Sequence, residues 1–133
     1  MSVLSNEAMT LFNNAGASKV LATIDSVGSL NVVPKGSLSA IDGDTLIYAE
    51  ILGGGKTEGN LKPGNRVTAL AFIGSSLTGY QAKGKFQGFQ TSGSLFEKVA
   101  KRMKEMIHVD IRSVGVIRVE EVYSVAPTFV PKK

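Results

Sequence analysis

Residues 53–57 carry the pattern whose backbone and side chains could bind an anion. Three glycines, at positions 53–55, come directly before Lys56 and Thr57. Glycine lets backbone N–H groups approach an anion closely, while the lysine adds a cation and the threonine a hydroxyl group. The polar residues that follow can start a short helix, whose N-terminus carries partial positive charge. The pattern therefore predicts a binding site for a phosphate group.

Two other interpretations use the same residues. A flexible loop with Thr57 as a helix cap would need no ligand. A nucleoside triphosphate loop also ends in Gly-Lys-Thr, but it requires a glycine at the position that Glu50 occupies here. A carboxylate there would repel the phosphates, and no alternating pattern of strands and helices surrounds the segment. The flexible loop stays open as an alternative, whereas the triphosphate loop is disfavoured.

The composition excludes several kinds of site. The chain has no cysteine, so disulfides, thiolate catalysis and cysteine metal sites are absent. His108 is the single histidine, which excludes a metal site built from several histidines. The formal net charge of +4 suits an anionic ligand without requiring nucleic acid. No signal peptide and no apolar run of membrane-spanning length is visible, so we expect a cytoplasmic protein.

A lysine-rich strand raises the possibility of a nucleic-acid surface. Within residues 79–91, Lys83 and Lys85 fall on one face of the expected strand and aromatic residues such as Phe86 on the other. A binding surface would need the two kinds of side chain on the same face. We expect the aromatic residues in the core and the lysines in solvent, with a bulge at Gly88. Nucleic acid is therefore disfavoured as a ligand of this strand.

The chain is long enough for one domain, residues 1–133, with a substantial core, because 43% of its residues are hydrophobic. Helices are expected over residues 5–14 and from 94 toward 107, and an extended tail over 126–133. Six segments have the composition of strands: residues 19–24, 30–35, 45–50, 66–73, 79–91 and 113–123. Too few helices separate these strands for a parallel sheet. The sequence predicts a mainly β fold, a six-stranded antiparallel barrel that is closed or nearly closed.

Three local signals refine this expectation. Pro34 places the second strand at an edge or a bulge, because proline cannot donate a ladder hydrogen bond. Asp42 and Gly43 form a strong hairpin turn signal before the third strand. Ser94 and Glu97 have the spacing of a capping box, in which Ser94 would cap the long helix.

In the order and spacing of these segments, the chain resembles the flavin-binding split-barrel superfamily, the group named after pyridoxamine 5′-phosphate oxidase. It is most similar to the small FMN-binding proteins of that group. The likeness covers nearly everything from residue 19 to residue 125. It rests on residues 20–24, 30–36, 41–48, 55–61, 65–67 and 117–125.

The resemblance implies where flavin mononucleotide (FMN) would bind. Its phosphate would lie where the third strand meets the short helix, at Gly54, Gly55, Lys56 and Thr57. Its isoalloxazine ring would lie along the second and third strands, at Val32, Val33, Pro34, Lys35, Ala49 and Glu50. A cation at Lys35 would stabilise a reduced, anionic flavin, although a solvent-facing lysine is an equal alternative. A carboxylate beside the ring is unexpected, so we expect Glu50 to face solvent or to pair with a lysine.

The resemblance also implies a function and an assembly. The protein would be an FMN-dependent oxidoreductase with a small-molecule redox partner, or a non-catalytic flavin or electron carrier, and no side chain is expected to act as an indispensable acid or base. It would form a homodimer with FMN at the subunit interface, and residues 79–91 and the tail near Tyr123 are the candidates for the second subunit's contribution. The larger oxidases hold the vitamin phosphate with C-terminal residues that have no counterpart here, so vitamin B6 oxidation is not expected. A barrel that binds haem, a deazaflavin or nucleic acid stays open as an alternative.

Overall fold

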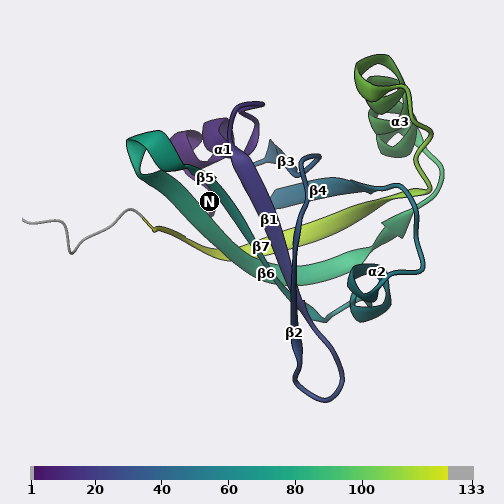
Figure 1. The fold of residues 1–133 in the computed structure, drawn as a ribbon, viewed down its shortest axis with the longest axis horizontal. Coiled ribbons are helices and arrows are strands. Elements are labelled where there is room, and N and C mark those ends of the chain that lie inside the picture. Colours follow the sequence, from purple (N-terminus) through teal and green to yellow (C-terminus); the bar gives the residue numbers. More distant parts are fainter. Residues whose placement is uncertain (1, 126–133) are drawn as a thin grey trace, which may run out of the picture.

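The computed structural model describes residues 2–125, and the tail expected over residues 126–133 lies outside them. The described chain folds into one curved sheet with helices around it (Figure 1). The strands are β1 (Ser18–Ile24), β2 (Leu30–Pro34), β3 (Ser39–Asp42), β4 (Thr45–Glu50), β5 (Arg66–Ile73), β6 (Thr78–Gln90) and β7 (Ser113–Ser124). The helices are α1 (Asn6–Phe12), α2 (Lys56–Asn60) and α3 (Ser94–Ile107), with a 3-10 turn η1 (Gly74–Ser76).

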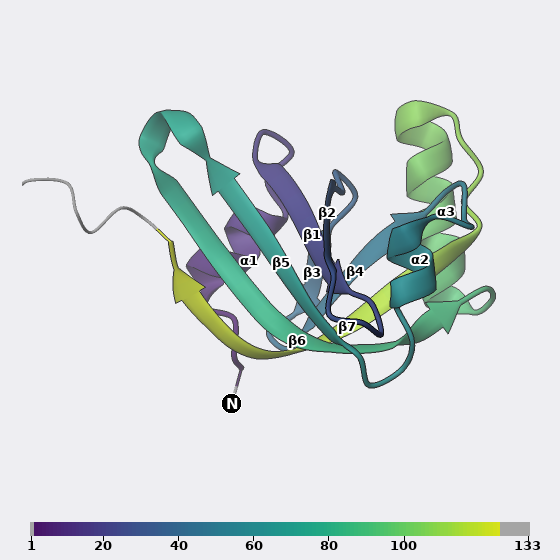
Figure 2. The ribbon, with the colours of Figure 1, turned by 60° about the horizontal axis from the view of Figure 1, so that its bottom comes forward.

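The sheet has the strand order β2-β1-β5-β6-β7-β4-β3, and every neighbouring pair is antiparallel. The long strands β6 and β7 sweep across the molecule and curl the sheet (Figures 1 and 2). The two edge strands, β2 and β3, are not hydrogen-bonded to each other, so the barrel stays open along this seam. The mainly β antiparallel barrel is confirmed, and Pro34 lies on an edge strand as expected.

The expectation of six strands is corrected to seven in the described residues, because β3 was not expected. This strand is only four residues long, and it is the incoming arm of a hairpin that turns at Gly43 and Asp44, one residue after the expected position. Its pairing with β4 is irregular between Ala40 and Asp42. A strand this short shows too few alternations to be distinguished from a loop by its sequence.

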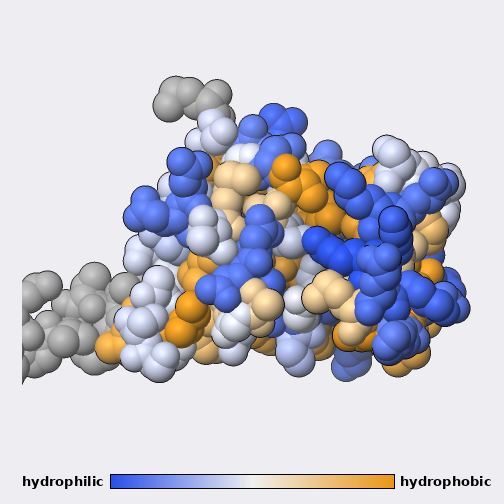
Figure 3. Space-filling model, turned by 90° about the horizontal axis from the view of Figure 1, so that it is seen from above, coloured by the Kyte–Doolittle hydropathy of each residue, from blue (hydrophilic) through white to orange (hydrophobic). Residues whose placement is uncertain are grey.

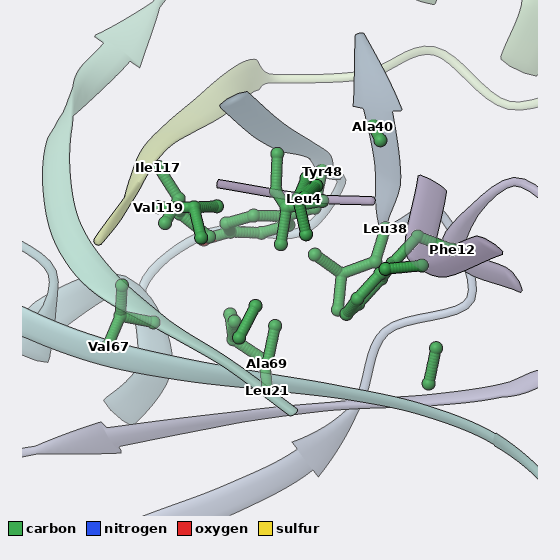
Figure 4. Packing of buried hydrophobic residues seen from close by; sticks show 14 of the residues in the cluster. Leu4, Phe12, Leu21, Leu38, Ala40, Tyr48, Val67, Ala69, Ile117 and Val119 are labelled. Atoms are coloured by element: carbon green, nitrogen blue, oxygen red, sulfur yellow. The ribbon is translucent and has the colours of Figure 1, made fainter. Parts of the chain in front are cut away.

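The barrel core is formed by side chains that alternate inward along the strands. Figure 4 shows Leu21, Tyr48, Val67 and Ile117, from four different strands, converging with Phe12 of α1. Strand β4 is buried on both faces, since Leu46 and Tyr48 enter this core. Its other face, with Ile47 and Ala49, packs under α3. Strand β4 therefore connects the core to the helix that lies outside the sheet.

Helix α3 spans the expected residues and packs on the sheet through Val99 and Met103. Its start differs from the expectation. Gly93, with φ of 97°, is the N-cap residue and no side chain caps the helix, so Ser94 does not form the expected capping box. Figures 1 and 2 both place α3 and α1 at opposite ends of the molecule. None of the helices in residues 2–125 is long and apolar enough to cross a membrane.

Strand β6 matches the alternation expected from its sequence. Lys83 and Lys85 are exposed and Phe86 is fully buried, so the aromatic ring belongs to the core and not to a lysine-lined surface. The pairing register of β6 with β7 shifts between Phe86 and Gly88, and Gly88 has φ of 133°. The expected bulge at Gly88 is confirmed.

Candidate functional site

A cavity of about 1110 Å³ opens where the two edge strands fail to meet. Its walls are formed by β2, the connection over residues 35–38, β3, the end of β4 with the loop that follows, α2 and the C-terminal half of α3. Cavities that bind small molecules are usually about 300–1,000 Å³. This cavity has room for a ligand at least as large as a nucleotide cofactor.

Eight of the ten residues that the sequence predicted for a cofactor site line this cavity. They are Val33, Pro34, Lys35, Ala49, Glu50, Gly55, Lys56 and Thr57. The other two, Val32 and Gly54, do not line it. Val32 lies on the opposite face of β2 and is 62% exposed. The backbone N–H of Gly54 donates to Oε1 of Glu58 at 2.6 Å, so it is already engaged.

Helix α2 is fixed to the β1–β2 hairpin by two side-chain amides. Nδ2 of Asn31 donates to Oγ1 of Thr57 at 2.9 Å, and Nδ2 of Asn60 donates to Oγ1 of Thr23 at 3.1 Å. Oγ1 of Thr57 accepts from Asn31, and no acceptor for its own O–H is found among residues 2–125, so this hydrogen is available to a ligand in the cavity. Sequence analysis missed both asparagines. The alternation of β2, which puts Asn31 on the same face as Val33, is the signal that could have indicated Asn31.

The loop before α2 is held by an ion pair. Nε of Arg112 lies 3.1 Å from Oε2 of Glu58, and a Cβ atom at Gly53 would overlap the Arg112 side chain. Gly53 and Gly54 both have positive φ, at 72° and 74°, which glycine adopts without strain. The hydrogen bond from Gly54, and then the Arg112 guanidinium, lower the pKa of the Glu58 carboxyl. The carboxylate therefore stays ionised at neutral pH.

Glu50 is buried at the end of β4, which corrects the expectation that it faces solvent or pairs with a lysine. It follows the alternation that also turns Tyr48 into the barrel. The Tyr48 hydroxyl donates to Oε1 of Glu50 at 3.1 Å, and the N–H of Gly53 donates to Oε2 at 3.3 Å. Burial, and then the neighbouring carboxylate, raise the pKa of Tyr48. The phenol is therefore a fixed donor to Glu50.

Lys35 is not the solvent-facing lysine that was the alternative interpretation. Its Nζ atom lies 5.2 Å from the centroid of the Tyr48 ring, within the range of a cation–π contact. The side chain is half-buried and lines the cavity. Tyr48 thus contacts a cation through its ring and an anion through its hydroxyl group.

A second basic group lies where α3 borders the cavity. Lys19 is 8% exposed and shares the inner face of β1 with Leu21. Its pKa is lowered by burial and then by Arg102, whose Nη2 lies 3.5 Å from Oγ of Ser39. The α3 end of the molecule is strongly hydrophilic at its surface, at the right of Figure 3. With Lys35 and Lys56, four basic side chains line the cavity against two acidic ones, which suits an anionic ligand.

Solved structures resemble this fold over almost their whole length. The HupZ protein of Group A Streptococcus is 28% identical with a TM-score of 0.80, and the match covers 92% of this chain and 94% of that one. A candidate pyridoxamine 5′-phosphate oxidase from Lactobacillus delbrueckii is 27% identical with a TM-score of 0.74, covering 92% and 95%. An FMN-binding protein from Syntrophomonas wolfei is 21% identical with a TM-score of 0.79, covering 90% and 84%.

These similarities agree with the strand order and the open seam. The chain has the flavin-binding split-barrel fold of the pyridoxamine 5′-phosphate oxidase-like group, as the resemblance of its sequence indicated. No family model matches the sequence, and no curated protein matches it.

Proposed function

We propose that the protein binds FMN in the seam cavity and acts as an oxidoreductase with a small-molecule redox partner. One observation carries the proposal: a single cavity joins apolar strand walls to a polar end that holds Lys56 and the Thr57 hydroxyl. An isoalloxazine ring requires the first kind of surface and a phosphate group the second. The S. wolfei protein of the same fold, which is FMN-binding by name, supports this choice of ligand.

The phosphate would lie against Gly55, Lys56 and Thr57. Lys56 supplies a cation, Thr57 supplies an O–H donor, and the hydrogen bond from Asn31 orients that hydroxyl. Charge-assisted hydrogen bonds of this kind are stronger than neutral ones. The proposed phosphate site therefore needs no rearrangement of α2.

The ring would lie between β2 and the end of β4, against Val33, Pro34 and Ala49. Because β2 is an edge strand, the backbone groups on its free side are not used by the sheet. These groups can hydrogen-bond the polar edge of the ring. The Nζ atom of Lys35 lies over the Tyr48 ring, beside this space. Its positive charge would favour a reduced, anionic flavin ring. The flavin would supply the redox chemistry, and the chain would bind it, orient it and set its potential.

We further propose a homodimer in which the second copy covers the seam. Leu30 and Val32 expose 72% and 62% of their surface on the outer face of β2, next to the open cavity. Isolated apolar side chains are common on protein surfaces, but an edge strand that carries two of them gains by being covered. Residues 79–91 and Tyr123 of the second copy remain the candidates to complete the site. Sedimentation of the wild-type protein should give a dimer, and Val32→Lys should give a larger monomer fraction.

The absorbance spectrum of protein purified without added cofactor tests the proposed ligand. Bound flavin gives two visible bands and a fluorescence signal on release, haem gives a sharp Soret band, and a nucleic-acid binder is colourless. Titration with FMN should show saturable uptake, and a folded sample that takes up none would contradict the proposal. Steady-state reduction by NADH or NADPH then separates an oxidoreductase from a flavin or electron carrier. A cytoplasmic location stays a prediction.

A further inference from the structure

The wall of the cavity beside the proposed phosphate site contains a fixed negative charge. Glu58 lines the cavity two residues after Lys56. Both of its carboxylate oxygens are engaged, Oε1 by the Gly54 N–H at 2.6 Å and Oε2 by Nε of Arg112 at 3.1 Å. A long acidic side chain usually moves freely in solvent, but this one is held at both oxygens in one position. The proposed FMN site does not use it.

From this geometry we infer that Glu58 determines specificity: it admits a flavin with one phosphate and excludes a flavin that carries two, such as flavin adenine dinucleotide (FAD). The inference rests on the proposed function and deepens it. A carboxylate held against a negatively charged group of the wrong ligand is an efficient means of rejecting that ligand.

The inference depends on the direction in which a ligand longer than FMN extends from the proposed phosphate site. On one side, the bonds from Asn31 to Thr57 and from Asn60 to Thr23 close α2 against the β1–β2 hairpin. A second phosphate that leaves the Lys56 site on the other side of α2 follows the loop of residues 53–58. There it would meet the Glu58 carboxylate, while the Gly54 N–H that could have bound it already donates to Glu58.

The charges of this loop lead to the same conclusion. Lys56 is its one cation and Glu58 its one anion. The Arg112 guanidinium pairs with Glu58 from the other side, over Gly53, and does not itself line the cavity, so the carboxylate is the charge that faces the ligand. Along this loop one phosphate meets the cation of Lys56, but a second phosphate meets none, because the other basic residues of the cavity, Lys19, Lys35 and Arg102, belong to other segments of its wall. Two negative charges a few ångströms apart repel each other strongly enough, even near a protein surface, to change affinity about ten-fold.

The test compares FMN and FAD binding to wild-type protein and to Glu58→Gln, by quenching of flavin fluorescence. Glutamine keeps an oxygen that can accept from Gly54, so the loop retains that hydrogen bond while the charge is removed. We expect the ratio of the FAD to the FMN dissociation constant to fall roughly ten-fold in the variant, with FMN affinity nearly unchanged. Glu97→Gln, at an exposed acidic residue in the first turn of α3, is the matched control and should leave the ratio unaltered.

Salt gives a second measurement that a purely structural role would not affect. In wild-type protein the ratio of the FAD to the FMN dissociation constant should fall as ionic strength rises, because salt screens the repulsion between Glu58 and the second phosphate. In Glu58→Gln this dependence on salt should be lost. An unchanged ratio in Glu58→Gln, or a variant that loses FMN as well, would overturn the inference. Failure of wild-type protein to bind either flavin would instead overturn the proposed function, so the two failures are distinguishable.

Discussion

Asn31 and Thr57 join the two sides of the candidate site, because Nδ2 of Asn31 on β2 donates to Oγ1 of Thr57 on α2 at 2.9 Å. The strand carries the apolar wall of the cavity and the helix carries the proposed phosphate contacts. This hydrogen bond therefore sets the spacing between the place for a ring and the place for a phosphate.

Removal of this link should weaken FMN binding without unfolding the protein. We expect Asn31→Ala to reduce FMN affinity by roughly 0.5–1.5 kcal/mol, the usual net contribution of one hydrogen bond. Thr57→Val should have at least as large an effect, since it also removes the donor to the phosphate. Thr57→Ser keeps the hydroxyl and serves as the control. Equal FMN affinities for the valine and serine variants, measured by fluorescence titration, would contradict the proposed role of Thr57.

Lys56 is the cation that we expect to contact the phosphate directly. Lys56→Ala should weaken FMN binding by roughly 1.5–3 kcal/mol, because it removes a hydrogen bond to a charged group. Lys62, an exposed lysine shortly after α2 that does not line the cavity, provides a control of equal charge change. Lys62→Ala should bind FMN as wild type does. If the two alanine variants bound FMN equally well, Lys56 would have no direct contact with it.

The Tyr48–Glu50 pair should make stability depend on pH at the alkaline end. Because the pKa of Tyr48 is raised above its ordinary value of 10.0, its contribution to the free energy of unfolding is complete below pH 10.0 and is lost progressively above it. Tyr48→Phe removes this dependence. It also leaves Oε1 of Glu50 without its donor, which should destabilise the neutral protein by roughly 1–3 kcal/mol.

Urea unfolding of wild type and Tyr48→Phe at neutral pH and above pH 10.0 measures both effects. The stability difference between the two proteins should shrink as the pH rises. Tyr123→Phe, at a residue that is 41% exposed, is the matched control and should change neither quantity much. A difference that stays constant with pH would show that the Tyr48 hydroxyl is not held in this way.

Gly84 should tolerate no side chain, because a Cβ atom there would overlap the backbone carbonyl of Arg118 on β7. Backbone atoms in a paired strand cannot move aside cheaply, so Gly84→Ala should lower the free energy of unfolding by about 2 kcal/mol or more. Gly59 lies inside α2, where an added Cβ atom would meet nothing within 4 Å. Gly59→Ala should be neutral or stabilising by roughly 0.5–1 kcal/mol. Thermal unfolding of the ligand-free proteins compares the two, and a stable Gly84→Ala variant would contradict this packing of β6 on β7.

The sequence determined those features of the protein that depend on neighbours along the chain. Alternation located six strands, the residues of α3 were expected correctly, and Pro34 and Gly88 indicated an edge strand and a bulge. The missed features are also local, but their signals are weak. Strand β3 has four residues, and Gly93 caps α3 although Ser94 is the better capping residue by composition.

The tertiary structure alone decided which side chains meet at the cavity. The paired residues are far apart in the chain: Asn31 and Thr57 by 26 positions, Glu58 and Arg112 by 54. Local propensity and periodicity depend on near neighbours and contain no information on such contacts. The curl of the sheet brings these segments together. It also leaves Glu50 buried at the end of β4, although the sequence had led us to expect that it faces solvent or pairs with a lysine. The sequence thus determined which groups could bind a phosphate, and the folded chain determined which of them are free to do so.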